Sequence, residues 1–104
     1  KAREHYEMPP YGRLAALIIS GENMSRVEEA VNGIGKARPT MPGLQVLGPA
    51  EAPLSMLRGR HRRRFLIKAR LGVRIQPVIQ SWLSRSRIKS GIRVQIDIDP
   101  YSFM

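Results

Sequence analysis

The run of residues 60–70 constrains the fold more than any other part of the chain, because a β-strand there would separate basic from apolar side chains. Side chains of a strand point alternately to its two faces. One face would carry Phe65, Ile67 and Ala69, which we expect to meet the core. The other face would carry Leu66 together with five basic residues: Arg60, Arg62, Arg64, Lys68 and Arg70. The run therefore predicts a strand with one buried face and one open, cationic face.

The spacing of apolar residues predicts five further elements around this strand. Strands are expected at residues 14–19, 44–47 and 93–99, and helices from Asn23 to Ile34 and from Ile75 to a stop at Gly91. Asn23 is a candidate N-cap, with Ser25 and Glu28 as an alternative capping box. Residues 48–53 are irregular by composition, and residues 54–57 are either a helical turn or an extended approach to the basic run.

The resulting order β-α-β-β-α-β is the split βαβ pattern of an α+β fold. It predicts a four-stranded antiparallel sheet with two helices on one face, and its first and third strands are central. The cationic row would then lie in the middle of the open face. His61 and Arg63 would fall on the core side, near the beginning of the strand, where we expect them to reach solvent.

The length of 104 residues predicts one domain, residues 11–104, preceded by a connector at residues 1–10 that ends at Pro9-Pro10. Because the first residue is Lys, we expect the chain to be a piece of a longer protein. There are no cysteines, so disulfides and thiolate metal sites are excluded. The longest apolar run, residues 14–19, falls far short of the roughly 20 residues that span a membrane.

The net charge of +10 indicates nucleic acid, an anionic membrane or an acidic protein segment as partner, of which we expect no membrane, and fourteen of the eighteen basic residues are arginines. Guanidinium groups bind phosphates and carboxylates through two parallel hydrogen bonds, which lysine does not. Nucleic acid is therefore the first partner to consider, and an acidic protein segment is the second. A solvated cationic face without any ligand is the third interpretation.

The sequence offers no catalytic constellation, so we expect no enzyme activity, no cofactor and no metal site in this chain. Neither a P-loop nor a G-x-G-x-x-G motif is present, and His5 and His61 have no ligand-type companions. Asp97 and Asp99 are interpreted as the polar side of an edge strand. Trp82 lies on the apolar stripe of the second helix and is expected in the core, not as a base-stacking platform.

Four stretches taken together resemble one family: residues 8–15, 46–54, 58–68 and 96–100. Their order and spacing are similar to the C-terminal domain of the primosomal replication-restart helicases (primosomal protein N′, PriA). The resemblance covers about residues 3–103. The Arg-Gly-Arg-His-Arg motif of the family corresponds to residues 58–62, with Lys68 after it. This chain departs from the family at His61, where an aromatic residue is frequent, and in its extra Arg63 and Arg64.

The resemblance implies that the chain is a non-catalytic domain of an ATP-dependent 3′-5′ DNA helicase that restarts abandoned replication forks. It implies a fold similar to a ribosomal small-subunit protein and a location in the bacterial cytoplasm, associated with the nucleoid. It also implies branched and single-stranded DNA, the helicase lobes of the parent chain and single-stranded DNA-binding protein as partners, the last docked through its acidic tail.

Two sets of candidate site residues follow from the basic run and the resemblance. The expected nucleic-acid contacts are Arg58, Arg60, His61, Arg62, Arg63, Arg64, Lys68 and Arg70. The expected contacts to the acidic tail are Arg60, Arg62, Arg70 and Arg74, with Met56 and Leu57 as the wall of an apolar pocket. A ribosomal-type RNA-binding domain and a module that binds only proteins are the alternative functions.

Overall fold

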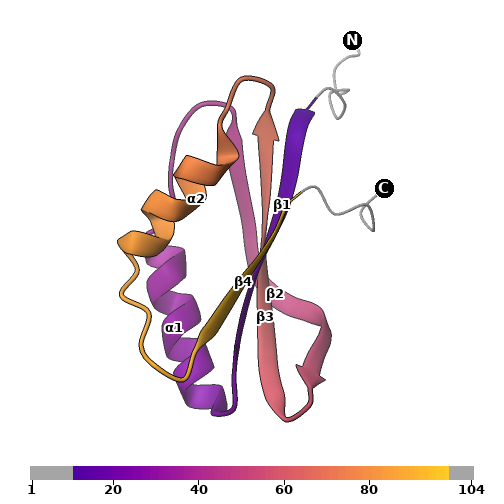
Figure 1. Ribbon diagram of the computed structural model, residues 1–104, viewed down its shortest axis with the longest axis vertical. Coiled ribbons are helices and arrows are strands. Elements are labelled where there is room, and N and C mark those ends of the chain that lie inside the picture. Colours follow the sequence, from indigo (N-terminus) through magenta and orange to yellow (C-terminus); the bar gives the residue numbers. More distant parts are fainter. Residues whose placement is uncertain (1–10, 99–104) are drawn as a thin grey trace.

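The computed structural model describes residues 11–98 and confirms the α+β architecture. The four strands form one antiparallel sheet in the order β2-β3-β1-β4, so that β1 and β3 are central. Both helices cover the same face of this sheet (Figure 1). The connector predicted at residues 1–10 and the residue Asp99 lie outside the described residues. The elements are β1 (Tyr11–Gly21), α1 (Met24–Lys36), β2 (Leu44–Leu57), β3 (Arg60–Arg70), α2 (Ile75–Ser84) and β4 (Arg93–Ile98).

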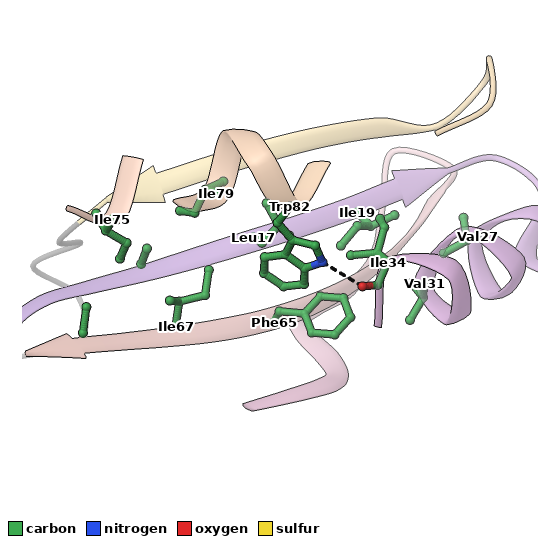
Figure 2. Close-up of a cluster of buried hydrophobic side chains, with 12 residues drawn as sticks. Leu17, Ile19, Val27, Val31, Ile34, Phe65, Ile67, Ile75, Ile79 and Trp82 are labelled. Atoms are coloured by element: carbon green, nitrogen blue, oxygen red, sulfur yellow. Dashed lines mark hydrogen bonds between the residues drawn. The ribbon is translucent and has the colours of Figure 1, made fainter. Parts of the chain in front are cut away.

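The core lies between the sheet and the two helices (Figure 2). Its sheet side is built from residues at every second position of the central strands: Ala15, Leu17, Ile19, Phe65, Ile67 and Ala69. The helices add the stripes that their 3.6-residue period predicts: Val27, Val31, Ile34, Ile75, Ile79 and Trp82. Trp82 is fully buried and meets Phe65 edge to face, with 5.3 Å between the ring centroids. The prediction that Trp82 belongs to the core is therefore confirmed.

Asn23 caps α1 as predicted, because its Oδ1 accepts a hydrogen bond from the backbone N–H of Arg26 at 3.0 Å. The predicted end of α2 at Gly91 is wrong, since the helix ends at Ser84. A left-handed backbone at Arg87, with φ of 53°, is incompatible with a continuing helix. Residues 85–92 therefore form a loop that leads to β4. Among the described residues, no helix has the length and apolar character needed to cross a membrane.

The prediction of a short second strand is also wrong, because β2 continues for 14 residues to Leu57. Its pairing with β3 shifts between Leu47 and Ala50, so the irregular composition there marks a β-bulge inside the strand. Gly48 has a φ of 114°, and a Cβ at this position would lie 2.8 Å from the carbonyl oxygen of Arg64. Only glycine allows the two strands to approach so closely.

Strands β2 and β3 are joined by a two-residue loop that the sequence interpretation did not identify. Leu57 pairs with Arg60, which leaves Arg58 and Gly59 as the loop residues. Their φ angles are 53° and 79°. Positive φ at both central residues is typical of a type I′ hairpin. The extended alternative for residues 54–57 is therefore the right one, and the basic motif begins at the tip of a hairpin.

Candidate nucleic-acid interface

The face of the sheet opposite the helices, here called the open face, carries the basic residues that the alternation predicted. Phe65, Ile67 and Ala69 are buried under the helices, so the residues between them point the other way. We name the basic residues of β3 on this face the open-face row: Arg60, Arg62, Arg64, Lys68 and Arg70. All five are at least partly exposed to solvent, and Arg70 is the most exposed of them.

Strand register places further side chains beside the open-face row. Arg62 lies opposite Ser20 of β1, and Ser20 lies opposite Arg93 of β4. One step along, Arg64 lies opposite Ile18. Leu66 then lies opposite Ala16, so an apolar band separates the arginines near the hairpin from the basic residues at the other end of β3. The row consequently forms two basic regions.

Arg60 is fixed in position by the end of β1. Its Nε donates a hydrogen bond to the hydroxyl of Ser20 at 3.3 Å, and its Nη2 donates to the carbonyl oxygen of Ser20 at 3.1 Å. Arg62 and Lys68 also make interactions within the chain. The hydrogen bonds of Arg60 hold its guanidinium against the sheet, which reduces the entropy that this side chain would lose on binding an anion.

Arg63 does not belong to the open-face row. It lies on the helix side of β3, where its Nη2 forms an ion pair with Oε2 of Glu28 in α1. The Arg63 side chain is only 23% exposed. The side chain thus reaches solvent in part, as expected, and a carboxylate of the same domain takes up its charge. His61 lies on the same side, opposite Met56.

A second basic region lies at the opposite end of β3. A hollow of about 410 Å³, here called the Arg70 hollow, opens between β3 and the beginning of α2. Its apolar wall includes Leu71, a residue that is 72% exposed, and Pro77. Its cationic residues are Arg13, Arg70 and Arg74. Such a hollow combines groups for carboxylates with a surface for apolar side chains.

The four residues predicted for an acidic tail do not form one site. Arg70 and Arg74 share the Arg70 hollow, whereas Arg60 and Arg62 lie near the hairpin. At about 3.3 Å per residue, Arg60 and Arg70 are separated by roughly 30 Å along β3. Met56 and Leu57 are exposed beside the hairpin loop and are likewise remote from the Arg70 hollow.

Sequence interpretation missed Arg13 as a member of the Arg70 hollow. Arg13 precedes the apolar run of β1 and pairs with Ala69 next to a register shift. Only the antiparallel pairing of β1 with β3 brings it beside Arg70. Across the described residues, His, Asp and Glu nowhere gather in a group of three that would hold a metal ion.

Comparison with known proteins gives one consistent result. The family model described as the primosomal protein N C-terminal domain matches residues 4–101. The replication restart protein PriA of Rickettsia felis is 37% identical over 101 residues. The proteins of the same name from Synechocystis and Treponema pallidum are 32% and 28% identical. The Rickettsia felis alignment covers 97% of this chain and 15% of the relative, so the chain spans a small part of the curated proteins it matches.

Proposed function

Because the chain belongs to the primosomal protein N C-terminal domain family, we propose that it serves a replication restart protein as a module that holds branched DNA. The module is non-catalytic in this proposal, and ATP-dependent unwinding belongs to other parts of a larger helicase. Its work would take place in the bacterial cytoplasm, at the nucleoid. The observation that carries the proposal is the open-face row on a central strand.

The hairpin half of the open-face row is suited to phosphate groups. Arg62 and Arg64 lie two residues apart on one face of β3, and Arg60 is held beside them by Ser20. Like charges brought this close together repel one another unless an anion neutralises them. A nucleic-acid backbone supplies anions in a regular series, and its binding releases counterions. The row therefore supports contacts to the DNA backbone.

Contacts to the backbone fit better than contacts to the bases. Recognition of single-stranded RNA or DNA by base stacking uses exposed aromatic side chains. Among the side chains that the structure describes, the aromatic residues are Phe65 and Trp82, and both are fully buried. This favours sequence-tolerant contacts to the backbone, which the ribosomal-type RNA-binding alternative would also make. Competition between an RNA hairpin and a forked DNA for the same chain would distinguish the two.

The test of the main proposal is a salt titration of binding to a fluorescent forked DNA. Each phosphate contact on duplex contributes about −0.9 to the slope of log K against log salt concentration. With three arginines at the hairpin half of the row, we expect a slope near −3 or steeper. An affinity that does not change with salt would contradict the proposal, because it would exclude counterion release.

A second function is favoured by the Arg70 hollow. We propose that this hollow docks the acidic, partly apolar tail of single-stranded DNA-binding protein. Arg70 and Arg74 offer guanidinium groups to carboxylates, and Leu71 offers exposed apolar surface beside them. Because the hollow and the hairpin lie at opposite ends of β3, one chain would hold DNA and the tail at the same time. A purely protein-binding module would instead bind the tail peptide and no DNA.

A further inference from the structure

A second hollow lies in the helix layer, between α1 and the loop that leads from α2 to β4. In Figure 1 this loop passes beside α1, on the side of the molecule away from the open face. The hollow, here called the α1 hollow, has a volume of about 530 Å³. None of its residues belongs to the open-face row or to the Arg70 hollow. It is lined by Arg26, Glu29, Ala30, Gly33, Ser86, Arg87, Lys89, Ser90 and Ile92.

The charge of the α1 hollow is positive. Three basic residues, Arg26, Arg87 and Lys89, face one carboxylate, that of Glu29. The Nζ of Lys89 lies 3.5 Å from Oε2 of Glu29, and both side chains are mostly exposed, so this ion pair is weak. Within residues 11–98, the guanidinium groups of Arg26 and Arg87 are in no ion pair. The hollow therefore has cationic groups available for an external anion.

Arg87 occupies a backbone conformation that arginine rarely adopts. Its φ is 53°, in the left-handed region that favours glycine and asparagine. In the described part of the chain, the residues other than glycine with positive φ are Arg58 and Arg87. Arg58 is at the hairpin tip beside the open-face row. A residue in a sparsely populated backbone conformation is a reason to look for a functional role.

Gly33 lines the same hollow, and it is a second residue that lowers the stability of the fold. Glycine inside a helix is less stable than alanine. A Cβ at Gly33 would meet no atom closer than the carbonyl oxygen of Ser86 at 3.9 Å, an ordinary contact. Packing therefore does not require glycine here. The absence of a side chain at Gly33 leaves the hollow open beside Ala30.

We propose that the α1 hollow binds a backbone phosphate of a second DNA segment, so that the domain bridges two arms of one branched DNA. The inference rests on the proposed DNA-holding function, and it assigns the second arm to the helix layer. The positive charge comes from Arg26, Arg87 and Lys89, and the hydroxyl of Ser90 adds a hydrogen-bond donor. The hydroxyl of Ser86 donates to the carbonyl of Trp82 at 2.8 Å and is therefore committed.

The two surfaces cannot be covered by one straight duplex. The open-face row lies on one side of the sheet, and the α1 hollow lies in the layer on its other side. A linear duplex on the open face would leave the hollow empty. A fork has a second arm that is able to turn around the edge of the domain. The structure of the domain thus offers a reason to prefer branched over linear DNA.

The test compares Arg87→Asn with the unchanged chain on a linear duplex and on a fork with the same arms. Asparagine keeps the left-handed backbone, so the variant is expected to fold and to unfold at the same or a higher temperature. We expect fork affinity to fall about tenfold, the usual effect of one charged hydrogen bond. The slope of log K against log salt concentration on the fork should become shallower by about 0.9, the contribution of one phosphate contact. Affinity for the linear duplex should not change.

Two more variants complete the experiment. Gly33→Gln fills the hollow and leaves every charge in place, so it should also weaken fork binding selectively. Lys36→Asn is the matched control, because it removes an exposed cation from α1 outside the hollow. If Arg87→Asn binds the fork as tightly as the unchanged chain does, the bridging inference is wrong while the open-face proposal stands. If the unchanged chain binds neither DNA, both proposals fail.

Discussion

The indole Nε1 of Trp82 in α2 donates a hydrogen bond to the backbone carbonyl of Ile34 in α1, over a distance of 2.7 Å (Figure 2). Both residues are fully buried, so water does not compete for either group. Ile34 lies in the last turn of α1, where carbonyl groups lack the usual i+4 partner, and its carbonyl also accepts from the backbone N–H of the C-cap Ala37 at 3.2 Å. One side chain of the second helix thus satisfies the end of the first, and the two helices are held together above the sheet.

Replacing Trp82 with phenylalanine is expected to destabilise the domain by about 2–4 kcal/mol. The substitution removes one of the two hydrogen bonds to the carbonyl of Ile34, leaving that from the backbone N–H of Ala37, and opens a cavity beside Phe65. Chemical denaturation followed by circular dichroism measures the free energy of unfolding. The exposed Met41 provides a control, since Met41→Ala should cost less than about 0.5 kcal/mol. Equal stability of the Trp82 and Met41 variants would show that the contact between the helices is unimportant.

Replacing Arg58 with asparagine should separate stability from DNA binding. Asparagine followed by glycine is a preferred pair for a type I′ loop, so Arg58→Asn should stabilise the hairpin by about 0.5 kcal/mol. The same variant loses one cation at the tip of the basic motif, and fork affinity should fall. Thermal unfolding and fluorescence anisotropy on one protein sample measure the two effects. Gly59→Ala is the opposite control, because its φ of 79° makes alanine destabilising.

Arg63 should contribute to stability more than to DNA binding. Its ion pair with Glu28 joins β3 to α1, and the two side chains are 23% and 42% exposed. For such partly exposed pairs, a double-mutant cycle of Arg63→Ala and Glu28→Ala should give a coupling of about 0.5–1 kcal/mol. Fork affinity of Arg63→Ala should fall less than that of Arg62→Ala. A larger loss for the Arg63 variant would mean that the ion pair opens to receive DNA.

The alternation of β3 was enough to predict its bounds, its buried face and the open-face row, because a period of two leaves no other assignment. Beyond Leu47 the same reasoning failed, since bulges in β2 break the period on which it depends. The end of α2 was missed for another reason. Arg87 has a positive φ, and an arginine in the sequence gives no indication of such a backbone conformation. The α1 hollow and the place of Arg13 in the Arg70 hollow were missed because they join residues distant in sequence.

The Arg70 hollow leads to a prediction about the acidic tail. The double variant Arg70→Ala/Arg74→Ala should weaken binding of an acidic, apolar-ended tail peptide by at least tenfold, because both guanidinium groups in contact with carboxylates are lost. Isothermal calorimetry with the peptide measures this loss. Arg62→Ala/Arg64→Ala removes the same charge from the other end of β3 and should leave peptide affinity within about twofold. Equal losses for the two variants would indicate attraction by net charge alone.

The central claim is that the hairpin half of the open-face row holds the DNA backbone, and the salt dependence of Arg62→Ala/Arg64→Ala tests it most directly. The matched protein is Arg70→Ala/Arg74→Ala, which has the same net charge. The slope of log K against log salt concentration on a forked DNA should become shallower by about 1.8 for the Arg62 and Arg64 variant, the contribution of two phosphate contacts, and by clearly less for the matched one. Equal slopes for these two variants and the unchanged chain would contradict the account.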